Sequence, residues 1–256
     1  MPSRYPYRPS PSSFSYSFGP GPMTPAIKAL VLANIVAFVA TWLARSLDLI
    51  GIFGLRWDLV IERFEVWRVV TYMFMHGGLF HILFNMLALW MFGVELERMW
   101  GSRYFLKYYF VCGLGGALTM LVLGLLPMPA FASLYSALTI GASGAVYGIL
   151  MAFALYFPNA PIILFFVFPV PARYAVMIMG GIALLSSIEA SGGGVAHAAH
   201  LGGLVAGYLY LKGGRLHLAS EIQYRFLKWR INRSRRRFDV YSGGRGRADD
   251  VDRRVH

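Results

Sequence analysis

The chain has 256 residues, of which 57% are hydrophobic and only 14% are charged. A soluble globular domain carries about a quarter charged residues, so this composition excludes an ordinary soluble protein. The net charge of +12 is concentrated at one end, because residues 212–256 hold thirteen Lys and Arg against five acids. Apolar runs recur through the middle of the chain, and about 20 residues suffice to cross a bilayer as a helix. The sequence therefore predicts an all-α polytopic membrane protein.

Residues 1–25 differ in composition from everything that follows. They include seven prolines and several serines, with Arg4 and Arg8 but no acid. This segment lacks the apolar stretch of a secretory signal and is poorer in Arg than an amphipathic transit peptide. We expect residues 1–25 to form a disordered extension.

Six apolar segments predict six membrane spans within a core of residues 26–211. The fourth and sixth are short for a full crossing, which is typical of helices that begin below the surface, at the floor of a water-filled cavity. The expected spans are 26–44, 80–100, 104–126, 142–157, 172–187 and 198–211.

The distribution of Lys and Arg predicts the orientation. Six spans leave both termini on one side, and the basic tail of residues 212–256 indicates that this side is cytoplasmic. The loops 127–141 and 188–197 contain no Lys or Arg, whereas the loop 46–79 contains three Arg and is expected to be a folded interfacial element. Apolar residues recur on one helical face within 216–237, which predicts a helix lying against anionic lipid. Nucleic-acid binding is not needed to explain the charge.

Polar residues inside spans are costly and are candidates for function. Here they are few, and each lies near the start of the second, fourth or sixth span, all of which run inward from the outer side. We therefore expect one shared site, a little below the outer surface. No Asp lies in a span and no HExxH motif is present, so neither an aspartyl mechanism nor a zinc-activated water is expected. The candidates are His81, Asn85, Ser143, Tyr147 and His200.

Ser143 and His200 both lie in glycine-containing motifs. Gly141 and Gly144 flank Ser143, which permits a tight turn and close approach of a substrate carbonyl, although Ser beside Gly is also common at helix contacts. His200 is followed by Gly203 and Gly207, a pattern that allows close contact with a neighbouring helix. If that neighbour is the fourth span, His200 can serve as a base for Ser143; otherwise it is a histidine hydrogen-bonded across helices.

The remaining candidates allow two interpretations each. His81 and Asn85 share one helix face, where they can donate to an oxyanion or bond between helices. The ring of Tyr147, four residues after Ser143, can pack against His200 or make an ordinary aromatic contact. His197 is predicted to be a loop residue, and no role is assigned to His76.

These motifs, in this order and spacing, resemble the rhomboid intramembrane serine proteases over about residues 26–211. The resemblance is carried by Trp67-Arg68, His76, the segment 81–85, Glu97-Arg98, the cluster 113–117, the GxSG motif at 141–144, and Ala199-His200 with its two glycines.

The resemblance implies a six-helix bundle with Ser143 as nucleophile and His200 as base. It implies an oxyanion hole of His81, Asn85 and the Ser143 backbone N–H, and no cofactor. It further implies cleavage of the transmembrane helices of single-span or multi-span membrane proteins near the outer interface. Substrates would enter past the second and fifth spans, with the loop around 191–194 as a cap. The expected location is a bacterial plasma (inner) membrane, with the site open to the outside.

Two alternatives remain. A non-catalytic rhomboid-like protein that binds and escorts membrane clients would need neither Ser143 nor His200. A transporter would be expected to show paired repeats or a buried charge suited to ion coupling, and the sequence has neither.

Overall fold

The structure is a computed structural model that describes residues 20–164, 168–188 and 194–213. The expected extension before residue 20, the cap residues 191–193 and the expected interfacial helix of 216–237 lie outside the described residues. The described part is mostly helical. Its longer helices are α1 (Pro25–Leu43), α5 (Leu79–Trp100), α6 (Ser102–Gly124), α7 (Ser143–Tyr156), α8 (Ala172–Ile188) and α9 (Gly194–Gly213).

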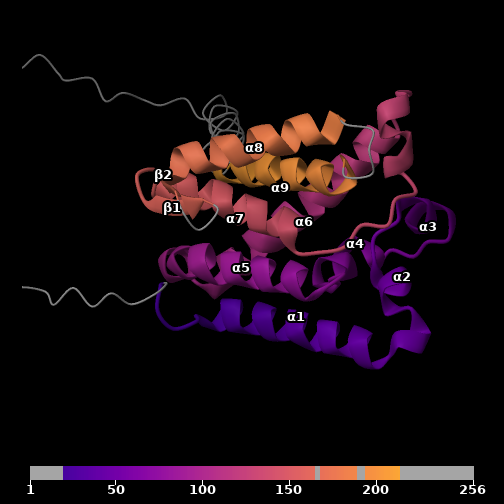
Figure 1. Cartoon of the computed structure of the whole chain (residues 1–256), viewed down its shortest axis with the longest axis horizontal. Coiled ribbons are helices and arrows are strands. Elements are labelled where there is room, and N and C mark those ends of the chain that lie inside the picture. Colours follow the sequence, from indigo (N-terminus) through magenta and orange to yellow (C-terminus); the bar gives the residue numbers. More distant parts are fainter. Residues whose placement is uncertain (1–19, 165–167, 189–193, 214–256) are drawn as a thin grey trace, which may run out of the picture. The chain divides into compact units, whose positions relative to one another are not determined.

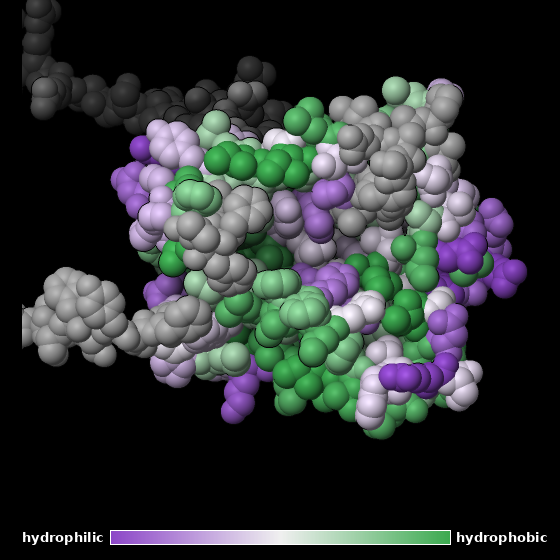
Figure 2. Space-filling view, in the orientation of Figure 1, coloured by the Kyte–Doolittle hydropathy of each residue, from purple (hydrophilic) through white to green (hydrophobic). Residues whose placement is uncertain are grey.

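These helices follow the expected apolar segments closely. Three of them, α1, α5 and α6, are long and apolar enough to cross a membrane, and α7 and α8 are shorter apolar helices. Across the view of Figure 1, α1, α5 and α7 follow one another, with α8 and α9 beyond α7. Large apolar side chains remain exposed on the helices, as at Leu32 (58%), Leu118 (55%) and Met177 (70%). Hydrophobic residues dominate the middle of the face in Figure 2, and hydrophilic ones gather toward its two ends.

The sixth helix departs from the expectation. It begins at Gly194 and has 20 residues, so the prediction of a short span starting at 198 is wrong. His197 therefore lies on a helix, one turn before His200, and not in a loop. The segment before Ala198 is rich in Gly, which in a sequence indicates a loop.

Close contacts between backbones fix α9 against α6 and α7. A Cβ on Gly203 would lie 1.9 Å from the carbonyl oxygen of Gly144 in α7. A Cβ on Gly202 would lie 2.8 Å from the carbonyl oxygen of Gly115 in α6. A Cβ on Gly207 would lie 3.1 Å from the Cα of Gly148. Because these neighbours include main-chain atoms, no larger residue fits without separating the helices.

The segment between α1 and α5 is folded, as expected. It contains η1 (Arg45–Leu47), α2 (Leu49–Phe53), α3 (Trp57–Glu62), α4 (Arg68–Thr71) and η2 (Tyr72–Phe74), and a further short helix, η3 (Pro129–Leu134), follows α6. Arg68 is buried and donates to the carbonyl oxygens of Gly51 and Gly54 at 2.6 and 2.7 Å. Trp57 Nε1 donates to the carbonyl of Ala117 in α6 at 2.9 Å. The Arg68 bonds hold the segment together, and the Trp57 bond ties it to α6.

A β-hairpin between α7 and α8 was not expected from the sequence. Strands β1 (Pro161–Leu164) and β2 (Phe168–Pro171) are antiparallel, with Ile162 opposite Val170. The all-α prediction is thus correct for the bundle but omits this element. Its apolar residues form one continuous run, so they do not alternate as those of a half-buried strand would.

The N-terminus of α1 is capped by a residue distant in sequence. The carboxylate of Glu97, near the end of α5, accepts hydrogen bonds from the N–H groups of Ala26 at 2.8 Å and Ile27 at 3.0 Å. It also accepts from the hydroxyls of Thr24 and Ser102. Because a helix leaves its first N–H groups without internal acceptors, this buried carboxylate supplies what α1 lacks.

Candidate active site

Ser143 stands at the first turn of α7, after an extended segment. Thr139 in that segment pairs with Leu55, exchanging backbone hydrogen bonds of 2.8 and 2.9 Å. Gly141 follows with φ of +115° and donates its N–H to the carbonyl of Tyr72 at 2.9 Å. A Cβ on Gly141 would lie 2.6 Å from His81 Nε2. Both the backbone conformation and the lack of space therefore require glycine immediately before the turn into α7.

The Ser143 hydroxyl lies beside the His200 imidazole. Ser143 Oγ and His200 Nε2 are 2.7 Å apart, a hydrogen-bond distance, although α7 and α9 bring them together from 57 residues apart. Tyr147 stacks on the His200 ring, with centroids 4.3 Å apart and planes 5° apart. An imidazole in this position can take the serine proton. The contact of Gly203 with Gly144 sets this separation, since both glycines lie one turn or less from the pair.

His200 Nδ1 differs from Nε2 in its surroundings. If Nε2 accepts from Ser143, a neutral imidazole carries its proton on Nδ1. That atom is buried, and it has no hydrogen-bond partner among the described residues. His197 contacts the ring from one turn earlier in α9, with centroids 5.9 Å apart and planes 86° apart.

His81 lies on α5 with its Nε2 toward Gly141, and its Nδ1 accepts a long hydrogen bond of 3.4 Å from the Gly77 N–H. An amide N–H only donates, so this contact makes Nδ1 the acceptor. A neutral His81 then carries its proton on Nε2, on the side of the ring that faces the Ser143 cavity.

Asn85 is buried one turn after His81. Its side-chain amide donates one hydrogen bond, of 2.8 Å, to the carbonyl of His81 within α5. The amide has two N–H groups, so this bond uses only one of them. Asn85 and Ser143 both line the cavities described below.

His76, to which the sequence assigns no role, lies beside His81. Its side chain is 1% exposed, and its ring contacts that of His81 with centroids 4.8 Å apart. Its Nδ1 lies 3.3 Å from the carbonyl oxygen of Phe74. Burial, with a smaller contribution from His81, lowers the pKa of His76 to about 4, so this ring is neutral near pH 7. Its signal in the sequence is its place among the residues that carry the rhomboid resemblance, five residues before His81.

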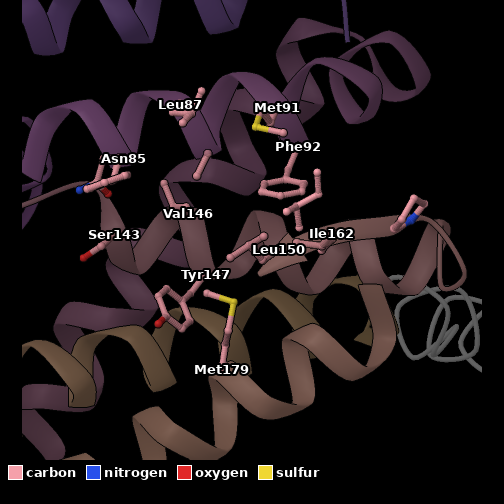
Figure 3. Close-up of a pocket in the computed structure, with 14 residues that line it drawn as sticks. Asn85, Leu87, Met91, Phe92, Ser143, Val146, Tyr147, Leu150, Ile162 and Met179 are labelled. Carbon is pink, nitrogen blue, oxygen red and sulfur yellow. The ribbon is translucent and has the colours of Figure 1, made fainter. Parts of the chain in front are cut away.

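Two cavities meet at Ser143. The smaller one, about 340 Å³, is lined by Ser143, His200, His81 and Asn85 together with the Thr139–Gly144 segment. The larger one, about 630 Å³, runs between α5 and α7 toward the hairpin and α8, and its lining is mostly apolar. Figure 3 shows Asn85 and Ser143 toward one end of the larger cavity and Ile162 toward the other.

Comparisons with known proteins converge on one family. A sequence model of the Rhomboid domain matches residues 63–214. Rhomboid protein 1, mitochondrial, of Saccharomyces cerevisiae is 38% identical over 138 residues, covering 54% of this chain and 38% of the yeast protein. Rhomboid protease GluP of Bacillus subtilis is 32% identical over 159 residues, covering 61% of this chain and 27% of that protein. Rhomboid protease AarA of Providencia stuartii is 29% identical over 197 residues, covering 70% and 69%. This chain thus spans well under half the length of the first two relatives.

Proposed function

The chain belongs to the rhomboid family, and we propose that it is an intramembrane serine endopeptidase with Ser143 as nucleophile and His200 as general base. Its family and its apolar helices make it an integral membrane protein. Relatives named as rhomboid proteases support the enzyme class. The observation that carries the assignment of residues is the 2.7 Å separation of Ser143 Oγ and His200 Nε2.

The reaction follows from that pair. Ser143 Oγ attacks the carbonyl carbon of the scissile peptide while His200 Nε2 takes the hydroxyl proton. The tetrahedral intermediate collapses, the C–N bond breaks, and His200 returns the proton to the leaving amine. Water, deprotonated by the same imidazole, then attacks the acyl-serine ester. The bond between the acyl carbon and Ser143 Oγ breaks, His200 returns the proton to Oγ, and the second product leaves as an acid. No carboxylate is assigned to this cycle, so the machinery is a Ser–His dyad.

The oxyanion of the intermediate would be stabilised from α5 and from the start of α7. The Nε2–H of His81, an amide N–H of Asn85 and the backbone N–H of Ser143 are the proposed donors. The Ser143 N–H belongs to the first turn of α7, where N–H groups lack helical acceptors. Loss of one oxyanion donor in serine proteases costs roughly 3–4 kcal/mol of transition-state stabilisation.

The larger cavity supports a membrane-protein substrate. Its volume of about 630 Å³ falls within the range of roughly 300–1,000 Å³ of ligand sites, and its lining is apolar beyond Ser143, Asn85 and Tyr147. We place the scissile bond at Ser143, with the apolar part of a single-span or multi-span substrate continuing between α5 and α7 toward the hairpin.

We further propose a six-span rhomboid core over residues 26–211, with both termini cytoplasmic, in a bacterial plasma (inner) membrane. The site would open toward the outside. Residues 1–25 would precede this core as an extension, and residues 212–256 would follow it as a basic tail at anionic lipid.

The test is cleavage of a reporter membrane segment by the full chain in liposomes. Wild type is compared with Ser143→Ala and His200→Ala, and with Ser46→Ala as a control at an exposed serine in η1. Wild type and the control should cleave, and the two dyad variants should not. Equal cleavage by all four proteins would contradict the dyad. Failure of folded wild type to cleave any of several reporters would favour a client-binding protein.

A further inference from the structure

The β-hairpin between α7 and α8 has two outer edges that differ in their backbone groups. In an antiparallel pair, alternate residues of each strand bond to the partner strand, and the N–H and C=O of the residues between them point outward. The Ala172 N–H donates to the Ala160 carbonyl oxygen at 2.8 Å. In the same register Ile162 follows two residues later, opposite Val170. Ala160 and Ile162 therefore bond inward, and the N–H and C=O of Ile163 point away from β2.

Prolines occupy the outward positions of β2. These positions are Pro169 and Pro171, the partners of Ile163 and Pro161 in the register. Proline has no N–H, so across Phe168–Pro171 the outer edge of β2 offers acceptors but no donor, which disfavours the pairing of a further strand. The outer edge of β1 keeps the N–H and C=O of Ile163. One edge of the hairpin is thus closed to another strand and the other is open.

The open edge borders the cavity that contains Ser143. Pro161, Ile162 and Ile163 all line the larger cavity of about 630 Å³, and none of the described residues of β2 does. Successive side chains of a strand point to opposite faces, and accordingly Ile162 is buried and Ile163 is 61% exposed. A cavity that meets three consecutive residues therefore lies along the edge of the strand and not against one face. Figure 3 shows Ile162 toward the end of this cavity opposite to Ser143.

We propose that the outer edge of β1 binds the main chain of the substrate where its membrane helix ends, by strand addition at Ile163. This inference rests on the proposed protease function. Ile163 exchanges two hydrogen bonds, through its N–H and C=O, with one residue of an extended substrate segment. Unpaired backbone groups are costly beside an apolar region of a membrane protein, so this pairing favours binding. Because every residue except proline carries both groups, the contact accepts many substrate sequences and rejects proline.

The length of α7 sets where the paired substrate residue lies. This helix has 14 residues and is about 21 Å long, with Ser143 at its first turn and the hairpin beyond its last. A substrate helix that runs beside α7 covers the same distance in about 14 residues. We expect the residue that pairs with Ile163 to lie about 12–18 residues from the scissile bond, on its membrane side.

Changes in the enzyme and in the substrate test for a main-chain contact. Ile163→Pro removes the outward N–H without removing a bond between β1 and β2, whereas Ile163→Val keeps that N–H and most of the side chain. Pro169→Val is the control, since it adds an N–H to the other edge of the hairpin. In a reporter segment that wild type cleaves, proline is placed at each position of the expected window, with alanine at the same position for comparison.

The experiment measures kcat and KM with the full chain in liposomes, with thermal unfolding in detergent as a check. Loss of one hydrogen bond weakens binding about fivefold, so Ile163→Pro should raise KM at least about fivefold with little change in kcat. Ile163→Val should raise KM clearly less, and Pro169→Val should not change it. One reporter position should show a similar rise in KM when proline replaces alanine. The Ile163→Pro enzyme should be insensitive at that position, because the pairing is already lost.

An unchanged KM in folded Ile163→Pro would overturn the inference and leave the protease function standing. Equal rises in Ile163→Pro and Ile163→Val would also overturn it, since they would assign the contact to the side chain. If Ile163→Pro does not fold, the reporter series with wild type decides, and the absence of any position where proline raises KM above alanine would overturn the inference. If wild type cleaves no reporter, the proposed function fails and this inference with it.

Discussion

Gly203→Ala tests how the fold sets the distance between Ser143 and His200. The added Cβ would lie 1.9 Å from the Gly144 carbonyl oxygen, where an ordinary contact begins at 3.4 Å. The atom and its neighbour must therefore separate by roughly 1.5 Å, and the neighbour is main chain that cannot rotate away. Since Gly144 follows Ser143 directly, most of this displacement reaches the hydroxyl.

The consequences for activity and stability differ in size. A displacement of 1 Å stretches the 2.7 Å contact of Oγ and Nε2 beyond hydrogen-bond range, and misplacement on this scale costs about 10²-fold in rate. Overpacking of this kind lowers the free energy of unfolding by roughly 1–3 kcal/mol. Gly203→Val should be worse, abolishing cleavage together with stability.

The assay is reporter cleavage in liposomes together with thermal unfolding in detergent. Gly181→Ala is the matched control: it makes the same change within helix α8, where a Cβ would meet nothing within 4 Å. The control should be fully active and, because Ala favours a helix by about 1 kcal/mol over Gly, at least as stable as wild type. A Gly203→Ala variant with normal activity and stability would falsify the argument that this glycine sets the separation of α7 and α9.

Three further predictions concern the residues around Ser143. His81→Gln should retain more activity than His81→Asn, because the Gln amide reaches the position of Nε2 and the Asn amide only that of Nδ1; equal activities measured by reporter cleavage would contradict the proton assignment. Asn85→Ala should lower kcat by roughly 10²–10³-fold with little change in KM, since an oxyanion exists only in the transition state, and equal effects on both constants would indicate a structural role instead. His76 has a pKa of about 4 in the folded chain against an ordinary 6.5, so the unfolded chain binds its proton first and the His76 contribution to stability is lost as pH falls from 6.5 toward 4. Unfolding measured across that window should be less acid-sensitive in His76→Gln than in wild type, and an unchanged profile would refute this assignment.

The sequence predicts the long helices well because lipid imposes one requirement along their whole length. The structure places α1, α5 and α6 within two residues of the expected segments. The candidate site could also be predicted from the sequence, because polar residues are rare in such segments and stand out. Ser143, His200 and Tyr147 were identified in this way, and the structure brings all three side chains together.

What the sequence did not predict depends on contacts between distant segments. The first turn of α9 includes glycine, and it is helical where the local sequence favours a loop. His76 lies before α5, outside the apolar periodicity, and its ring contact with His81 gives its place beside the site. Arg68 is buried although it is charged, because two backbone carbonyls and Glu65 accept its hydrogen bonds. None of these contacts has a signal in local composition.

The capping of α1 by Glu97 has a consequence for biosynthesis. The ribosome makes α1 first, but the carboxylate that receives its terminal N–H groups is 71 residues further along the chain. Until Glu97 at the end of α5 has been synthesised, α1 lacks this cap. Glu97, which accepts hydrogen bonds from both Ala26 and Ser102, then joins α1 to the corner between α5 and α6. Completion of this corner is therefore the earliest point in synthesis at which α1 can receive its cap and be joined to α5.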